Sequence, residues 1–219
     1  MTDTTSLLRL MSWLSPVFPT GGFAYSAGLE QAVAGAGVSD VVSLQTWVAT
    51  QIENGNLWND AVFFAEAYRN AGDAEKLTEL TRHAIAMTNA YERLDEAILQ
   101  GTSFIQAARP WVDLEQLSSR GTPLPICVGC AAGSELIDLN SALSAYLHAF
   151  VTNQLQAAIR LSAIGQSGAA RLLSALEPVI ANAARLAANS TLEDLGTCAF
   201  FADIEAMKHE TLQPRLFRS

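Results

Sequence analysis

The sequence has few charged residues, which make up 16% of its 219 positions, against about 25% in a typical soluble domain. Acidic residues outnumber basic ones by 22 to 13, giving a formal net charge of -9, and no block of lysine and arginine occurs. Because binding to nucleic acid or anionic membranes depends largely on positive charge, we predict neither role. A thinly charged surface is often covered by another chain, which indicates a partner protein.

The sequence also lacks the segments that direct or anchor a chain outside the cytosol. Its N-terminus is polar and slightly acidic, whereas a signal peptide begins with positive charge followed by an apolar stretch. No run of about 18 apolar residues occurs, so we expect no membrane-spanning helix. The three cysteines are an odd number and are most simply explained as reduced thiols. Together these features predict a cytoplasmic protein.

Sequence signatures of catalysis are missing as well. The phosphate-binding pattern GxxxxGK[ST] and the nucleophile pattern GxSxG do not occur. No combination of residues supplies a base, a nucleophile and an oxyanion site together. We therefore predict that the protein is not an enzyme and holds no tightly bound cofactor.

Cys127 and Cys130 form the one spacing typical of a metal site, CVGC. A tetrahedral zinc site needs four ligands, and no second pair lies nearby in the sequence. Two functional alternatives stay open, namely a metal carrier that also uses a histidine such as His209, and a thiol redox protein with a lowered thiol pKa. The simpler interpretation is that both cysteines are small buried apolar residues.

Alanine is abundant and alternating β-branched runs are nearly absent, which favours helix. Apolar residues recur at the three- and four-residue spacing of amphipathic helices. We predict an all-α, single-domain bundle of about 8–10 helices over residues 1–207, followed by a flexible, partner-binding tail over 208–219. Asp40 is the predicted N-cap of one helix, and the stretch 15–23 is a rigid connector rich in proline and glycine. The expected helical segments are 7–14, 24–34, 40–55, 56–70, 73–88, 89–109, 126–133, 139–162, 169–188 and 192–207.

The tail differs from the rest of the chain because it is polar and basic. Two apolar residues, Leu216 and Phe217, stand between Arg215 and Arg218. Such a terminus is normally disordered unless something holds it. The apolar pair either anchors in a groove on another protein or folds back onto its own chain, and the residues alone do not decide between the two.

Three segments resemble signature motifs of the urease accessory protein F family. They are LSPVFPTGGFAYSAGLE (Leu14 to Glu30), IRLSAIGQSGAARLL (Ile159 to Leu173) and MKHETLQPRLFRS (Met207 to Ser219). Their order is that of the family, and the helices between them agree in length and type. Two features depart from the family pattern, since Lys208 stands where arginine is usual and the CVGC pair is not typical.

The resemblance implies an all-helical homodimer that works with other urease accessory proteins. Its implied partners are urease accessory protein D (also called H), the GTPase accessory protein G and apo-urease. In that family the complex is a chaperone that inserts nickel into the urease active site and depends on GTP hydrolysis. The GTP is bound by the partner GTPase, and the F protein itself acts as a scaffold and regulator.

The resemblance also implies which residues contact partners. Tyr25 and Glu30 are expected at a surface that partners read, and Arg160, Gly165 and Gln166 are expected to shape an exposed helix break. Two structural alternatives stay open, a core tyrosine at Tyr25 and a simple helix C-cap at Gly165. The tail residues expected to become ordered on binding protein D are His209, Glu210, Arg215, Leu216, Phe217 and Arg218.

Overall fold

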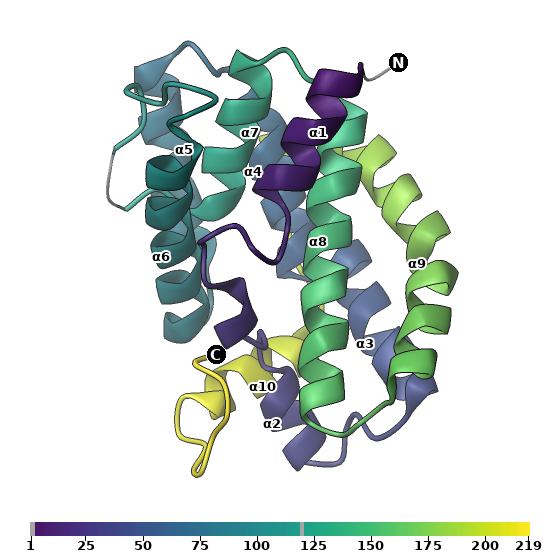
Figure 1. Cartoon of the computed structure of the whole chain (residues 1–219). Coiled ribbons are helices and arrows are strands. Elements are labelled where there is room, and N and C mark those ends of the chain that lie inside the picture. The colour runs from purple at the N-terminus through teal and green to yellow at the C-terminus, as the bar shows by residue number, and fades with distance from the viewer. Residues whose placement is uncertain (1–2, 119–120) are drawn as a thin grey trace.

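The computed structural model describes residues 3–118 and 121–219. The predicted domain 1–207 includes the four other positions, which lie outside the described residues. The described part contains ten α-helices, two short 3₁₀ helices and no strand, which confirms the predicted all-α single helical domain (Figure 1). None of its helices is long and apolar enough to cross a membrane. In chain order the elements are α1 Thr4–Trp13, η1 Gly22–Ala24, α2 Leu29–Ala34, α3 Val41–Asn54, α4 Asn56–Arg69, α5 Ala74–Met87, α6 Tyr91–Ala108, α7 Leu124–Ser134, α8 Leu139–Arg160, α9 Gln166–Ala187, η2 Leu192–Asp194 and α10 Phe200–His209.

Aspartate side chains fix where several helices begin. The Asp40 carboxylate accepts a hydrogen bond from the backbone N–H of Ser43, and the Ser43 hydroxyl accepts one from the backbone N–H of Asp40, so the two form a capping box at α3. This confirms Asp40 as the predicted N-cap. The same bond from a backbone N–H to an aspartate side chain begins three other helices. The aspartates are Asp3 at α1, Asp73 at α5 and Asp138 at α8.

The core is built around the contact between α4 and α7, which lie inside the bundle (Figure 1). Helix α7 is buried along most of its length, and its glycines allow a very close approach. A Cβ at Gly129 would lie 2.3 Å from the carbonyl oxygen of Phe64, and one at Gly133 would lie 2.4 Å from that of Tyr68. Any side chain at either position would therefore force the two helices apart.

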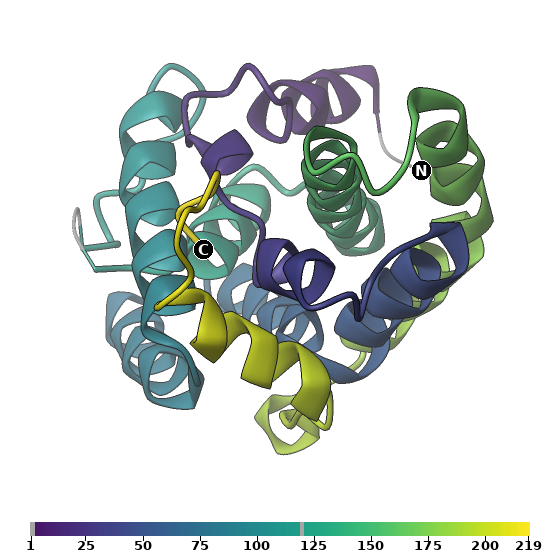
Figure 2. The same ribbon diagram turned by 90° about the horizontal axis from the view of Figure 1, so that it is seen from below.

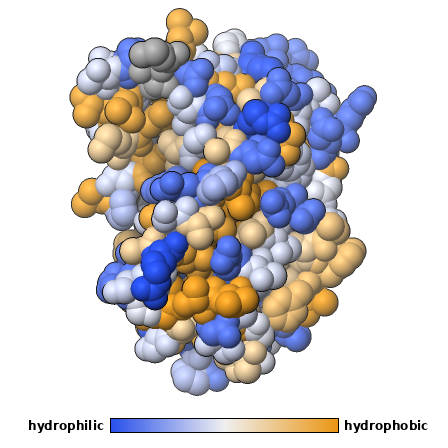
Figure 3. All heavy atoms as spheres, turned by 90° about the vertical axis from the view of Figure 1, so that its right-hand side faces the viewer, coloured by the Kyte–Doolittle hydropathy of each residue, from blue (hydrophilic) through white to orange (hydrophobic). Residues whose placement is uncertain are grey.

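The long helices α8 and α9 form an antiparallel pair on one side of the bundle, joined by residues 161–165 (Figure 1). Leu161 caps the end of α8, and Ser162 reverses the chain with a φ of 60°. Gly165 has an extended backbone and is the N-cap of α9, not the C-cap of α8. The side of the molecule on which α9 lies mixes hydrophilic and hydrophobic residues (Figure 3).

We expect Gly129→Ala to lower the free energy of unfolding by about 1–3 kcal/mol, the usual effect of overpacking a core, because the new Cβ would meet the Phe64 carbonyl. Urea denaturation followed by circular dichroism measures the change. Gly72→Ala is the matched control, because nothing lies within 4 Å of a Cβ there. Its stability should stay within about 0.5 kcal/mol of the parent. Equal effects of the two substitutions would contradict this account of the α4–α7 contact.

Candidate functional site

The C-terminal segment, residues 208–219, packs against its own chain. Figure 2 shows it running beside η1 and across the end of α6. His209, the last residue of α10, is 0% exposed and Phe217 is 3% exposed. This corrects the prediction that the tail is flexible and that His209 lies on a mobile segment. Phe217 folds back onto the chain, whereas its neighbour Leu216 is 55% exposed.

The Glu30 carboxylate, in the first turn of α2, holds the C-terminal segment in place. Its Oε1 accepts the backbone N–H of Leu216 at 2.6 Å, and its Oε2 accepts that of Phe217 at 2.9 Å. The Nε2 of His209 lies 3.1 Å from the same Oε2. Burial acts to raise the pKa of Glu30, but these two N–H groups and the His209 ring outweigh it and hold that pKa below its usual value.

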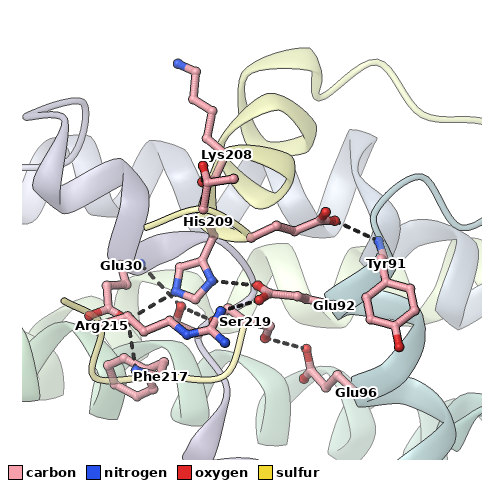
Figure 4. Close-up of polar contacts among 12 residues, drawn as sticks. Glu30, Tyr91, Glu92, Glu96, Lys208, His209, Arg215, Phe217 and Ser219 are labelled. Atoms are coloured by element: carbon pink, nitrogen blue, oxygen red, sulfur yellow. Dashed lines mark hydrogen bonds and ion pairs between the residues drawn. The ribbon is translucent and has the colours of Figure 1, made fainter. Parts of the chain in front are cut away.

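A second carboxylate, Glu92 in the first turn of α6, completes this arrangement (Figure 4). Its Oε2 lies 2.6 Å from the Nδ1 of His209, and its Oε1 pairs with the Arg215 guanidinium. His209 therefore stands between two carboxylates, each of which also binds the segment 215–217. A neutral imidazole carries one N–H, so the ring donates to both carboxylates only when it is protonated.

The end of the chain pairs with the first of the three motifs. The backbone N–H and the hydroxyl of Ser26 both donate to the carbonyl of Ser219, the former at 2.8 Å. The N–H of Arg218 donates to the carbonyl of Ala24 at 2.8 Å. The Ser219 hydroxyl donates to Oε2 of Glu96 in α6 at 3.0 Å. With the bonds to Glu30, the last residue of the first motif, the third motif is thus hydrogen-bonded to the first from Leu216 to Ser219.

Arg160, from the second motif, joins the other two. Its Nη1 donates to the carbonyl of Phe23 at 2.5 Å, and its guanidinium lies 4.2 Å from the centroid of the Phe217 ring. Gly165 and Gln166 do not take part, because they lie exposed at the start of α9, away from the bonds described above. The structure therefore brings one of the three predicted helix-break residues to the site.

Tyr25 and Glu30 are both buried, which corrects the expectation that they lie at the surface. Tyr25 is 4% exposed, which agrees with the alternative that it is a core tyrosine. The Arg218 guanidinium lies 5.5 Å from the centroid of its ring. Glu210 accepts the backbone N–H of Tyr91 at 3.0 Å, at the start of α6. Lys208, the departure from the family pattern, pairs with Glu205 on its own helix and points away from His209 (Figure 4).

A cavity of about 560 Å³ lies next to this segment, between α6 and α8, with the connector 15–23 along one side. Arg93 and Glu96 lie in its wall and, with Asp60 next to Arg93, form a group of charges that sequence reasoning missed. Arg93 pairs with Asp60 and lies 3.6 Å from Glu96, while the Tyr146 hydroxyl donates to Asp60 at 3.4 Å. Burial raises the pKa of both carboxyl groups. The available sequence signal was the three-residue spacing of Arg93 and Glu96 on one helix face.

Cys127 and Cys130 are fully buried in α7. Burial raises the pKa of the Cys127 thiol well above its usual value and that of Cys130 to about 11, although Gln116 donates to the Cys130 sulfur. A reactive thiol is accessible and has a lowered pKa, so the burial of this pair supports the interpretation of two small buried apolar residues. Within residues 3–118 and 121–219, no group of three His, Cys, Asp or Glu side chains could hold a metal ion.

We expect iodoacetamide at about pH 8 to modify the exposed Cys198 rapidly and the two buried cysteines of α7 hardly at all, since only accessible thiolates react. Mass spectrometry of the native protein should show one alkyl group, against three after unfolding in urea. Rapid labelling of Cys127 in the native protein would contradict its assignment as a structural residue.

We expect Glu30→Gln to release residues 215–219, because an amide cannot accept both backbone N–H groups and the His209 ring. Hydrogen exchange at the amides of Leu216 and Phe217 should accelerate at least about tenfold, which corresponds to about 1.4 kcal/mol. Acid should act in the same way, because Glu30 has a lowered folded pKa. Its contribution is present above the unfolded value of about 4.3 and is lost as the pH falls through the folded value.

The exposed Glu53→Gln is the matched control for the Glu30 substitution. It lies at the end of α3, and exchange in the C-terminal segment should not change. If the amides of Leu216 and Phe217 exchange as slowly in Glu30→Gln as in the parent protein, then Glu30 does not hold the C-terminal segment in place.

Comparisons with known proteins place the chain among urease accessory proteins. The family model described as UreF matches residues 38–177. The urease accessory protein UreF of Mesorhizobium japonicum is 49% identical over 224 residues and covers 100% of both chains. That of Brucella ovis is 49% identical over 217 residues, 99% of this chain and 95% of the relative, and UreF 1 of Brucella anthropi is 45% identical over 218 residues with the same coverage. Because the model spans more than half of the sequence and these relatives nearly all of it, the chain belongs to the UreF family of urease accessory proteins.

Proposed function

We propose that this protein is a non-catalytic scaffold and regulator of urease maturation. In this proposal it works in the cytoplasm as a homodimer with accessory protein D (H), the accessory GTPase G and apo-urease. The complex is a chaperone that inserts nickel into apo-urease and depends on hydrolysis of GTP. The GTP is bound by the partner GTPase, so this chain needs no cofactor of its own. Family membership and the near full-length identity to proteins named as accessory proteins support this role.

One observation carries the assignment of the binding surface for protein D. The C-terminal segment, Arg160 and the connector are tied together by hydrogen bonds and by the contact of Arg160 with Phe217. Two large apolar side chains stay exposed there, Phe23 at 69% and Leu216 at 55%. Exposed apolar residues on a rigid, hydrogen-bonded frame are typical of interface anchors.

The C-terminal segment is already ordered in the isolated chain, and this changes how the partner binds it. Because Glu30 and Glu92 already hold residues 215–217, protein D meets a preformed surface and does not have to order the tail. Binding to a preformed surface avoids the entropy cost of ordering a chain segment. The side chains offered to the partner are then the exposed ones, Leu216 and Arg218, and not the buried His209 and Phe217.

A separate apolar stripe on α10 supports contact with a second protein chain. Phe200, Ile204 and Met207 recur at the spacing of one helix face, and all three are exposed. Such a stripe is unusual on a protein that stays alone in solution. We assign it to the homodimer contact.

We expect Phe23→Ala together with Leu216→Ala to reduce co-purification with protein D at least tenfold, because loss of interface anchors costs about 2 kcal/mol or more. Both side chains are largely exposed, so the free energy of unfolding should change by no more than about 0.5 kcal/mol. Deletion of 208–219 is a poorer test, because it also removes the buried His209 and Phe217.

The matched control is Leu136→Ala, an equally apolar residue that is 87% exposed between α7 and α8. It should leave both co-purification and activation of apo-urease at the level of the parent protein. Full co-purification of the Phe23/Leu216 double variant would overturn the assigned surface.

A further inference from the structure

His209 is a fully buried histidine at the junction of three parts of the chain. It ends α10, and its ring lies between the Glu30 carboxylate of α2 and the Glu92 carboxylate of α6 (Figure 4). Both carboxylates also hold the C-terminal segment, Glu30 by accepting two of its backbone N–H groups and Glu92 by pairing with Arg215. A change in the charge of the ring therefore acts on the two groups that fix this segment.

The two nitrogens of the His209 ring have the same kind of neighbour. Nδ1 lies 2.6 Å from Oε2 of Glu92, and Nε2 lies 3.1 Å from Oε2 of Glu30. A protonated ring carries an N–H on both nitrogens and donates to both carboxylates, whereas a neutral ring leaves a lone pair facing one of them. Because a buried carboxylate that loses a donor is destabilised, the neutral ring weakens this arrangement.

The other charged groups that face this site are paired elsewhere. Arg215 binds Oε1 of Glu92, the oxygen that does not contact the ring. Lys208 pairs with Glu205 on its own helix and points away from the ring, and Glu210 accepts a backbone N–H at the start of α6 (Figure 4). The two carboxylates are thus balanced by Arg215 and by the ring proton. Loss of that proton leaves one buried negative charge uncompensated, which is costly.

We propose that His209 is a pH-dependent switch for the order of the C-terminal segment. The protonated ring holds residues 215–217 against α2 and α6, and loss of its proton releases them. Histidine changes its charge between about pH 5 and pH 8, so the switch works near neutral pH. Because one proton is involved, the equilibrium between the held and the released segment shifts by at most about tenfold per pH unit.

The Glu30 carboxylate sets the opposite limit of this switch. Because its pKa is lowered in the folded chain, its contribution is lost as the pH falls, whereas that of the His209 proton is lost as the pH rises. The segment is therefore held most firmly between the two limits. The consequence for protein D rests on the proposed function: the partner meets a preformed surface at the lower pH and a released segment at the higher pH.

The test is hydrogen exchange at the amides of Leu216 and Phe217, measured by NMR in the isolated protein at about pH 6.5 and about pH 8.5. Dividing the exchange rate of an unstructured peptide at each pH by the measured rate gives a protection factor that is free of base catalysis. We expect both protection factors to fall at least about tenfold at the higher pH. That of the buried Phe64 in α4 should change by less than about twofold, because the release is local. Equal protection of Leu216 and Phe217 at the two pH values would overturn the proposal.

Two variants assign the effect to the His209 ring. In Glu92→Gln a neutral ring can donate to Glu30 and accept from the new amide, so protection should change by less than about twofold between the two pH values. His209→Gln has no titrating group at this place and should be equally insensitive to pH. The matched control is His148→Gln on the exposed side of α8, which should keep the tenfold fall. A tenfold fall that persists in Glu92→Gln or His209→Gln would overturn the proposal.

These measurements use the isolated chain and are independent of any partner. A negative result would overturn the switch and leave standing the surface assigned to protein D, which is tested by the Phe23/Leu216 double variant. Failure of that double variant would in turn leave the pH dependence of the C-terminal segment unaffected.

Discussion

The position of the C-terminal segment depends on the hydrogen bonds that the buried carboxylate of Glu30 accepts. Bonds from N–H groups to an ionised carboxylate are among the stronger hydrogen bonds in proteins, and Glu30 accepts two from the backbone of residues 216–217 and faces the ring of His209. Removing the segment would leave this carboxylate buried without donors, which costs more than the bonds themselves contribute. The polar and basic tail therefore stays ordered although its composition is typical of a disordered terminus.

This anchoring also sets the position of the other two motifs. With residues 216–217 fixed, the Phe217 ring provides the face on which Arg160 rests, and Arg160 in turn binds the carbonyl of Phe23. The chain end reaches Glu96, the same carboxylate that faces Arg93 at the cavity. The connector, the end of α8 and the C-terminal segment thus form one continuous frame beside the cavity, in which Arg160 contacts both Phe23 and Phe217.

The helices could be predicted from the sequence because their signals are local, but the arrangement of the tail could not. Asp40 caps α3 through Ser43, three residues away, whereas Glu30 binds Phe217 across 187 residues. A change of backbone direction caused a further difference between the predicted and the observed helices. The predicted helix 24–34 is shortened to Leu29–Ala34 because Ala27 and Gly28 take positive φ values of 52° and 83°, and a Cβ at Gly28 would lie 2.9 Å from the backbone nitrogen of Ala206 in α10. Neither the positive φ angles nor the close approach to Ala206 produces a periodic pattern in the sequence, so neither could be predicted from it.

The buried charges beside the cavity were missed for a similar reason, and they are the feature that stability alone explains least. Replacing a buried ion pair by apolar residues of similar volume is often neutral or stabilising, so the core gains little from Asp60, Arg93 and Glu96. Their arrangement is also unbalanced, with two carboxylates for one guanidinium. Neutral donors compensate the second carboxylate, because the Gln100 amide and the Ser219 hydroxyl both donate to Glu96, and the Tyr146 hydroxyl donates to Asp60. The end of the chain therefore belongs to this charged group, which links the order of the C-terminal segment to the wall of the cavity.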